Sequence, residues 1–312
     1  MKGKVFIAAP VHQVLTEGLQ AAGYSLIYAN EGTQEEAFEL IGDCTGIIIS
    51  TRLQLNKALL DVAAQLQWIG RMGSGMEVID VAYATKKGIR CFSSPEGNCN
   101  AVAEHAVGML LSLTKRIAWS AEEVKHGYWK REENRGTELE GKTIGIIGFG
   151  HTGQAFAKKL QGFDMNILVY DKNNSKVMPA YVTKCRDLQP LYDQADIVSF
   201  HVPLSADTIH YVNETFLLRM NQSFVLINTS RGEVIDTEVI KRGIETGKIR
   251  AAALDVWTEE PLERMGIRQR EILDELVKLP QVIITPHIAG YTYEALYKMS
   301  ATLLKKILII NH

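Results

Sequence analysis

Residues 143–153 read TIGIIGFGHTG, an apolar run that ends in the spacing G-x-G-x-x-G. This pattern predicts a strand, a tight turn and the first residues of a helix. Gly148 permits the turn, Gly150 lets a phosphate approach the backbone, and Gly153 lets the helix pack closely against the strand. We therefore expect a dinucleotide to bind here.

A second apolar run, at 165–170, ends in Asp171, about 20 residues beyond the glycines, as in dinucleotide-binding folds. A carboxylate at this point accepts hydrogen bonds from the hydroxyls of an adenosine ribose and repels a 2′-phosphate. The sequence thus favours NAD as the cofactor. Lys172 and Lys176 follow closely and keep NADP as the alternative.

Composition narrows the class of protein. The 312 residues are enough for two domains, and 34 basic against 36 acidic side chains give a net charge of −2. We expect a small-molecule ligand, and neither nucleic acid nor a membrane as partner. The first residues resemble a strand more than a signal peptide, and the four cysteines lack a C-x-x-C pair, so we expect a cytoplasmic protein with reduced thiols and no metal site.

Apolar runs alternate with helix-like stretches along the whole chain, which is typical of parallel α/β sheets. Five runs precede the glycine motif, and six strand candidates begin with it, at 144–148, 166–170, 196–200, 224–228, 250–254 and 282–285. The predicted fold class is α/β, with two Rossmann/flavodoxin-like doubly wound parallel-sheet domains and an interdomain cleft.

Two helices bear on the domain boundaries. The stretch 100–116 is apolar on most sides, so we expect it to be buried between domains or between subunits. The stretch 292–310 has a helical pattern and is expected to cross back onto the first domain. The prediction is a substrate-binding, flavodoxin-like domain at 1–98 plus 291–312, and an NAD-binding Rossmann domain at 99–290.

Three of the expected strand ends carry groups suited to hydride-transfer chemistry. Arg231 offers a planar cation that binds a carboxylate through two hydrogen bonds. His287 offers a proton donor and acceptor, and Glu260 a carboxylate that could fix its tautomer. Carboxyl ends of parallel strands lie at one edge of a sheet, so we expect these groups to form one site.

Eleven short segments together carry a resemblance that extends over nearly the whole chain. They are GSG at 73–75, ID at 79–80, AVAE at 101–104, GTEL at 136–139, GKT at 141–143, the glycine motif, HVPL at 201–204, NTSRG at 228–232, LDV at 254–256, and EEP at 259–261 with PHIA at 286–289. In these segments the chain resembles the D-isomer-specific 2-hydroxyacid dehydrogenase family, with short phosphoglycerate dehydrogenases most similar.

The resemblance implies roles for individual residues. Arg231 would bind and polarise the substrate, His287 would be the general acid and base, and Glu260 would pair with His287, with Glu259 as the fallback. Asp255 would hold the carboxamide of the nicotinamide. The full set of implied cofactor contacts comprises Ser74, Gly148, Gly150, His151, Thr152, Gly153, Asp171, Val202, Thr229, Asp255, Ala289 and Gly290.

The substrate implied is a 2-hydroxy or 2-oxo acid held by Arg231 and by backbone amides at Ser74 and Gly75. The phosphoglycerate enzymes of the family usually carry an arginine where this chain has Ser50, which leaves Arg52 and Arg71 as candidates to bind a phosphate. The first expectation is a 3-phosphoglycerate dehydrogenase of serine biosynthesis. Hydroxypyruvate or glyoxylate reduction is the alternative.

A different class of function is an NAD-sensing corepressor, in which the same fold serves partner binding. That reading does not require the complete trio of Arg231, Glu260 and His287, so the sequence favours an enzyme. The family also implies a homodimer, for which the 100–116 helix and Trp119 offer surface.

Overall fold

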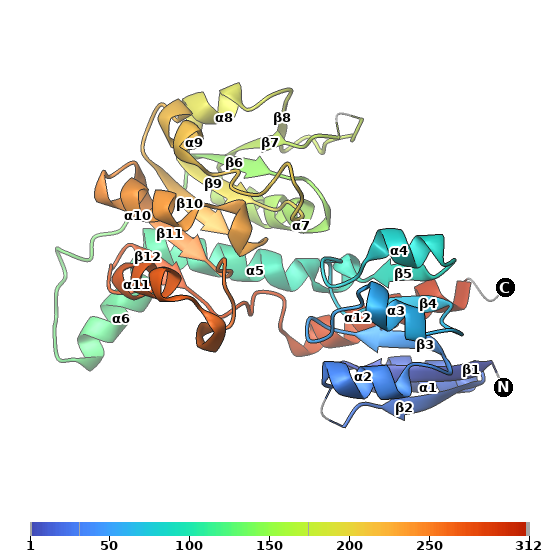
Figure 1. The fold of residues 1–312 in the computed structure, drawn as a ribbon. Helices are drawn as coiled ribbons and strands as arrows, with labels where there is room; N and C mark the ends of the chain where they lie inside the picture. The colour runs from blue at the N-terminus through green and yellow to red at the C-terminus, as the bar shows by residue number, and fades with distance from the viewer. Residues whose placement is uncertain (1, 31, 174, 310–312) are drawn as a thin grey trace. The chain divides into compact units, whose positions relative to one another are not determined.

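The computed structural model describes residues 2–30, 32–173 and 175–309. It separates into two compact units, of which unit 1 comprises Met1–Cys99 and Tyr291–His312 and unit 2 comprises Asn100–Gly290 (Figure 1). The sequence had suggested breaks after residues 98 and 290. Residues 310–312, which include the end of the expected C-terminal helix, lie outside the described residues.

Unit 1 is a five-stranded parallel sheet in the order β2-β1-β3-β4-β5, with helices between its strands. Strand β3 is buried along its entire length, as expected when both faces of a parallel sheet are covered. The strands are β1 (Gly3–Ala8), β2 (Tyr24–Tyr28), β3 (Cys44–Ile49), β4 (Trp68–Arg71) and β5 (Arg90–Ser93), and the helices are α1 (Gln13–Ala21), α2 (Gln34–Leu40), α3 (Lys57–Val62), α4 (Val81–Lys86) and α12 (Tyr293–Ile309).

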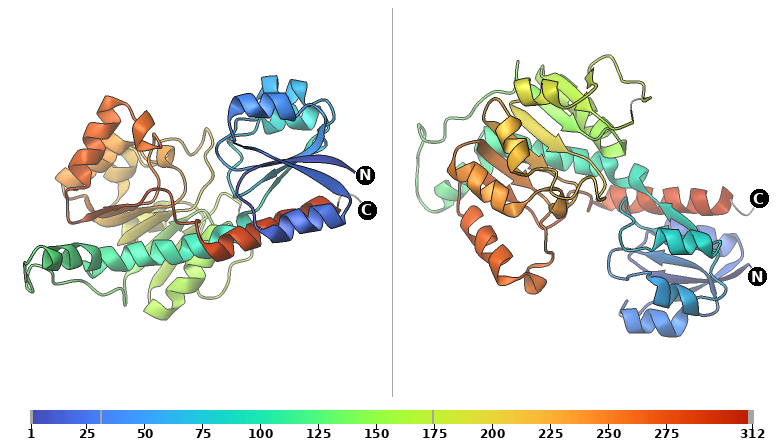
Figure 2. Two further views of the ribbon diagram at one scale, coloured as in Figure 1. Left: turned by 90° about the horizontal axis from the view of Figure 1, so that it is seen from below. Right: turned by 45° about the horizontal axis from the view of Figure 1, so that its top comes forward.

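Helix α12 belongs to unit 1 although it follows unit 2 in the chain. It lies along α1, as both views of Figure 2 show. Leu303 and Ile307 are fully buried in the core that contains Val5 and Leu15. The Ser300 hydroxyl accepts a hydrogen bond from the His12 amide at 3.0 Å. The core of unit 1 therefore needs both ends of the described chain.

Unit 2 is a seven-stranded parallel sheet in the order β12-β11-β10-β9-β6-β7-β8. The order reverses at β6, which pairs with both β7 and β9. The strands are β6 (Thr143–Ile147), β7 (Asn166–Tyr170), β8 (Thr183–Cys185), β9 (Ile197–Phe200), β10 (Phe224–Asn228), β11 (Ile249–Leu254) and β12 (Val282–Ile284), and the helices are α5 (Pro95–Thr114), α6 (Ile117–Lys125), α7 (His151–Leu160), α8 (Gln189–Gln194), α9 (Glu214–Arg219), α10 (Thr237–Glu245) and α11 (Ile267–Leu276).

Two elements differ from the expectation. The sheet of unit 2 has a seventh strand, β8, whose three residues, Thr183–Cys185, form no apolar run and become a strand only by pairing with β7. Helix α5 begins at Pro95 rather than at residue 100, since proline is well suited to the first turn of a helix. It ends at Thr114, and Arg116 has a left-handed backbone with φ of 55° that leads into α6.

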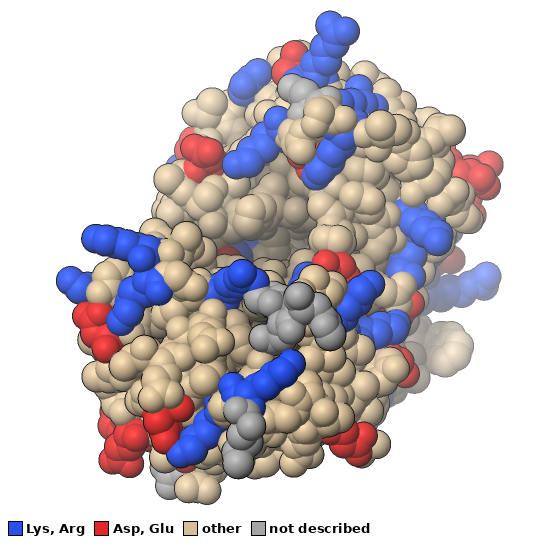
Figure 3. All heavy atoms as spheres, turned by 90° about the vertical axis from the view of Figure 1, so that its right-hand side faces the viewer, with Lys and Arg blue, Asp and Glu red and all other residues tan. Residues whose placement is uncertain are grey.

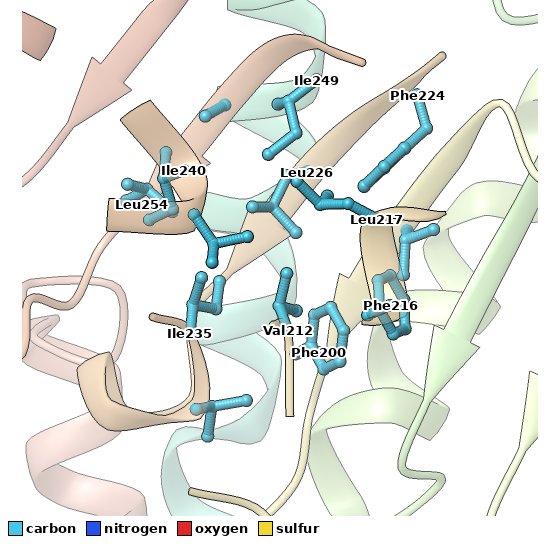
Figure 4. Close-up of a cluster of buried hydrophobic side chains, with 14 of the residues drawn as sticks. Phe200, Val212, Phe216, Leu217, Phe224, Leu226, Ile235, Ile240, Ile249 and Leu254 are labelled. Carbon is cyan, nitrogen blue, oxygen red and sulfur yellow. The ribbon is translucent and has the colours of Figure 1, made fainter. Parts of the chain in front are cut away.

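One face of the unit 2 sheet packs on an apolar core that includes aromatic contacts. Phe216 of α9 lies against Phe200 of β9 and Phe224 of β10, with ring centroids 5.8 and 6.3 Å apart (Figure 4). Ile240 of α10 and Leu254 of β11 complete the labelled cluster on the other side. This core fixes the strands whose carboxyl ends carry the functional side chains.

The surface carries both signs of charge. Figure 3 shows lysine and arginine side chains together with aspartate and glutamate on one face, in keeping with the net charge of −2. Among the described residues, no helix is both long and apolar enough to span a lipid bilayer.

Candidate active site

The glycine turn after β6 lies where the sequence predicts a bound phosphate. Gly148 has φ of 92°, and a Cβ there would lie 2.4 Å from the His201 carbonyl oxygen. At Gly153 a Cβ would lie 2.2 Å from the Gly148 carbonyl oxygen, so α7 packs against the turn. A Cβ at Gly150 would meet nothing within 4 Å. That open space at the N-terminus of α7 fits a diphosphate.

Asp171 ends β7 beside this turn and is 8% exposed. Its Oδ2 accepts from the Phe149 amide at 2.7 Å and from Lys176 Nζ at 2.8 Å, and its Oδ1 accepts from the Asn173 amide at 2.8 Å. Burial alone would raise the pKa of Asp171, but these three donors outweigh it and hold the pKa below its ordinary value. Asp171 is therefore an anion at neutral pH.

The remaining expected cofactor contacts of unit 2 lie along the same edge of the sheet. His151 and Thr152 form the first turn of α7, and Val202 follows β9 with its Cγ1 3.0 Å from the Cβ position of Gly148. The hydroxyl of Thr229, after β10, is buried and has no hydrogen-bond partner within the described residues. A buried hydroxyl of this kind suits a bound polar group, so the residues present fit a dinucleotide.

Asp255 follows β11 and is 1% exposed. Its Oδ1 accepts from the Thr285 hydroxyl at 2.6 Å and from the Ile288 amide at 2.9 Å, and its Oδ2 accepts from the Ala289 amide at 2.8 Å. His105 Nε2 of α5 lies 3.0 Å from the same Thr285 hydroxyl. This network, which we call the Asp255 network, holds the segment 285–289 in place.

His287 lies within that segment and contacts Glu260. Its Nδ1 is 2.7 Å from Glu260 Oε2, and Glu260 Oε1 accepts from the Trp257 amide at 2.7 Å. The backbone of His287 is left-handed, with φ of 55°, and its amide donates to the Asp255 carbonyl at 2.8 Å. Glu259 instead accepts from the Gly266 amide at the start of α11. Glu260 thus orients the imidazole of His287, and the Asp255 carbonyl positions its backbone.

Arg231 follows β10, next to the segment that carries Glu260. A Cβ on Gly232 would lie 2.0 Å from the Trp257 carbonyl oxygen, so the two segments touch through their backbones. The Arg231 carbonyl accepts from Asn228 Nδ2 at 2.8 Å, and its guanidinium donates to the Ser230 carbonyl at 2.6 Å. Adjacent strands β10, β11 and β12 therefore present Arg231, Glu260 and His287 at one sheet edge.

The residues expected to bind substrate from the other domain lie in unit 1. Arg71 is 8% exposed and donates to the Met72 carbonyl at 2.9 Å, and its guanidinium fills the space beside Gly73, 1.4 Å from where a Cβ would be. Ser74 is exposed and Gly75 half-buried in the turn that follows. Arg52 is exposed. Arg71 thus braces the 73–75 turn from within.

Three residues of this site were not among those expected from the sequence: Thr285, His105 and Asn228. Thr285 connects His105 to Asp255, and Asn228 connects the ends of the Arg231 turn. A histidine within an otherwise apolar helix, and polar residues that end buried strands, were the available signals. Neither signal identifies the residue that forms the hydrogen bond, because the bonded residues are far apart in the sequence.

Comparisons with known proteins give one consistent result. The model of the D-isomer-specific 2-hydroxyacid dehydrogenase NAD-binding domain matches residues 107–289. The chain is 32% identical to a hydroxypyruvate reductase of Thermotoga maritima over 97% of both chains. It is 31% identical to a D-3-phosphoglycerate dehydrogenase of Archaeoglobus fulgidus, over 94% of this chain but 54% of that protein. The structure of a D-lactate dehydrogenase from Aquifex aeolicus with NAD and lactic acid superposes with a TM-score of 0.83, at 27% identity, covering 99% of this chain and 95% of the other.

Proposed function

Since this chain belongs to the D-isomer-specific 2-hydroxyacid dehydrogenase family, we propose that it interconverts a small D-2-hydroxy acid and the corresponding 2-oxo acid at the carboxyl ends of β10, β11 and β12. It is an NAD-dependent oxidoreductase that acts on a CH–OH group. The observation that carries the assignment of the site is the 2.7 Å contact between His287 Nδ1 and Glu260 Oε2.

NAD supplies the acceptor of the hydride, or NADH its donor. The glycine turn at Gly148, Gly150 and Gly153 would hold the diphosphate, and Asp171 the adenosine ribose. Thr229 would offer its buried hydroxyl to the same ligand. In this proposal Asp255 mainly holds the segment 285–289, and its Oδ2 also keeps capacity to accept from a carboxamide.

His287 would move the proton. A carboxylate only accepts hydrogen bonds, so Glu260 Oε2 requires the proton on Nδ1 of His287. That leaves Nε2 to give a proton to the substrate oxygen during reduction and to remove it during oxidation. The carboxylate of Glu260 also stabilises the protonated imidazole, which is the acid needed to reduce a ketone.

Arg231 would bind the substrate carboxylate and polarise its carbonyl. Its backbone is fixed from both sides, by Asn228 and by the close contact of Gly232 with Trp257. A planar guanidinium suits a carboxylate because it donates two parallel hydrogen bonds. In unit 1, the backbone amides of the Ser74 to Gly75 turn are a proposed carboxylate-binding group, and Arg71 supports that turn.

The substrate we favour is an unphosphorylated 2-oxo acid such as hydroxypyruvate or glyoxylate. Ser50 stands where a phosphate-binding arginine was expected, and Arg71 is buried and engaged by its own turn. The similarity to a hydroxypyruvate reductase over 97% of both chains supports the same choice. Arg52, which is exposed, and the similarity to phosphoglycerate dehydrogenases support 3-phosphoglycerate as the second candidate.

Hydroxypyruvate and 3-phosphohydroxypyruvate differ only in the phosphate, so they form a matched pair for the assay. We expect NADH oxidation by the purified protein with hydroxypyruvate at a higher kcat/KM than with 3-phosphohydroxypyruvate, with glyoxylate as a third substrate. A preference for the phosphorylated acid that is lost in Arg52→Ala would establish the second candidate. NADH binding without turnover of any 2-oxo acid would instead contradict the assignment of an enzyme site.

We also propose that the chain forms a homodimer in the cytoplasm. Apolar side chains are exposed on α6 and the turn after it, where Val124, Tyr128 and Trp129 line a shallow hollow. Trp129 is 85% exposed, which is costly for so large an apolar side chain in water. The four free cysteines suit a reducing compartment. Light scattering of the wild type and of Trp129→Glu should show a dimer and a weakened dimer, respectively.

A further inference from the structure

We propose that Lys176 sets the cofactor selectivity of this enzyme, by neutralising Asp171 so that the adenosine-ribose site accepts a 2′-phosphorylated dinucleotide alongside NAD. The inference rests on the proposed dinucleotide site. It concerns the ammonium group of Lys176, which is held against Asp171, the carboxylate that would otherwise repel a phosphate.

Lys176 is held in place by two contacts. Its Nζ donates to Asp171 Oδ2 at 2.8 Å and to the Phe149 carbonyl at 3.1 Å. Phe149 lies between Gly148 and Gly150, so the ammonium group is fixed at the junction of the ribose carboxylate and the glycine turn. Its side chain is 31% exposed, which is low for a lysine on a loop.

The charge of Asp171 decides what the ribose site accepts. An aspartate that is 8% exposed and has a pKa below its ordinary value carries a full negative charge, which opposes a 2′-phosphate. With the ammonium of Lys176 at 2.8 Å, the pair has no net charge. A phosphate that approaches the pair meets a cation at close range and an anion that is already compensated.

The hydrogen-bond capacity of Asp171 points the same way. A carboxylate has about four acceptor positions, and the amides of Phe149 and Asn173 together with Lys176 occupy three of them. One position remains, whereas the two hydroxyls of an unmodified ribose need two, so one of the three donors has to give way. Lys176 is the side chain among them, and the other two donors are backbone amides. A 2′-phosphorylated ribose keeps one hydroxyl, which the free position can accept, and its phosphate gains a charge-assisted hydrogen bond from the Lys176 ammonium group.

Lys172 provides a matched control. It is adjacent to Asp171 in the sequence and carries the same charge as Lys176. Its side chain, however, is 77% exposed, and its ammonium group lies 4.0 Å from Asp207. General attraction between basic residues and a phosphate would involve both lysines. Of these two lysines, Lys176 is the one that contacts Asp171.

The test is calorimetric binding of ADP-ribose and of 2′-phospho-ADP-ribose to the full chain, which needs no catalysis. For the wild type we expect both compounds to bind. In Lys176→Met the Kd of the 2′-phosphorylated compound should rise about tenfold, the worth of one charge-assisted hydrogen bond. The Kd of ADP-ribose should stay the same or fall. Lys176→Arg should retain the wild-type ratio of the two Kd values, and so should Lys172→Met.

The outcomes separate this inference from the proposed function. A wild-type protein that binds neither compound would contradict the dinucleotide site itself. Binding of ADP-ribose alone by the wild type would overturn the role of Lys176 and leave the site intact. An unchanged ratio in Lys176→Met, or an equal change in Lys172→Met, would also overturn it. Thermal unfolding of each variant verifies that the chain is folded.

Discussion

At the carboxyl end of β6 three glycines, Gly148, Gly150 and Gly153, keep the backbone free of side-chain atoms at the turn and at the start of α7, whereas the ends of β11 and β12 are joined by the side-chain hydrogen bonds of the Asp255 network. Both ends lie along one edge of the same parallel sheet. The first end leaves space and exposed amides for a phosphate. The second end fills the space around Asp255 and fixes an imidazole.

The two ends should therefore fail in opposite ways. Adding an atom harms the glycine turn, because Gly148 and Gly153 lie against backbone oxygens. Removing a donor or acceptor harms the Asp255 network, because the Asp255 carboxylate is buried and satisfied by the Thr285 hydroxyl and the Ile288 and Ala289 amides. Variants at each end can separate cofactor binding from proton transfer.

The largest effect is expected at His287. His287→Ala removes the proposed acid and base, and kcat should fall by about 10² to 10⁴. The Kd of NADH should hardly change, because the glycine turn and Asp171 are untouched. Stopped-flow rates and NADH fluorescence titration measure the two quantities. A variant that keeps most of its turnover would show that another group moves the proton.

A smaller loss is expected when the partner of His287 is changed. Glu260→Gln keeps the shape but removes the charge that stabilises the protonated imidazole, so the rate of reduction should fall about tenfold or more. Glu259→Gln is the matched control, since Glu259 contacts the Gly266 amide and not the imidazole. Equal effects of the two changes on the rate of reduction would argue against the pairing.

Asp255→Asn should affect stability and turnover together. An asparagine amide would direct donors at the amides of Ile288 or Ala289, which are donors themselves. We expect a loss of about 1 to 3 kcal/mol in the free energy of unfolding, the cost of an unsatisfied buried polar group. Urea unfolding measures that loss, and the fall in kcat should follow from the displaced segment of His287. Wild-type stability would mean that the network is not needed to hold the segment.

The glycine turn offers a pair of variants one helical turn apart. Gly153→Ala places a Cβ 2.2 Å from the Gly148 carbonyl oxygen and should cost about 1 to 3 kcal/mol of stability. Gly150→Ala meets nothing within 4 Å and should cost less than about 1 kcal/mol. The Gly150 variant should nevertheless bind NADH more weakly, because its methyl group occupies the phosphate space. Thermal melts with and without NADH distinguish the two.

The last effect concerns acid stability at His201, whose backbone forms one wall of the glycine turn. Its Nδ1 is buried, and burial lowers the pKa of His201 to about 3. The folded protein thus holds the neutral imidazole, and this stability is present above the unfolded pKa of about 6.5 and is lost as the pH falls from there toward 3. Between pH 7 and pH 5 the loss should be about 1 to 2 kcal/mol. His201→Gln should show a smaller loss over the same range in urea unfolding.

The sequence could specify the glycine turn because its parts are local. Gly148, Gly150 and Gly153 act through backbone geometry within one strand, turn and helix, and Asp171 follows at the end of the next strand. The α/β class and the parallel order could also be read from alternating apolar runs. The seventh strand could not, since Thr183–Cys185 becomes a strand through its pairing with β7.

The Asp255 network was less accessible for the same physical reason. Thr285 and His105 are 180 residues apart in the chain, and nothing local to either predicts their contact. The position of Lys176 was visible as a basic residue near Asp171, but its second contact, with the Phe149 carbonyl, depends on how the loop folds back. Residue types indicated the chemistry, while three-dimensional packing selected the partners.

The place of α12 in the sequence has a consequence for synthesis on the ribosome. Leu303 and Ile307 close the core around Val5 and Leu15, yet they emerge only after all of unit 2 has been translated. The nascent chain consequently presents an uncovered apolar groove on its earliest segment while unit 2 already has every strand it needs. Chaperone demand should be concentrated in that interval, and a chain halted before residue 293 should aggregate through its first sheet rather than its second.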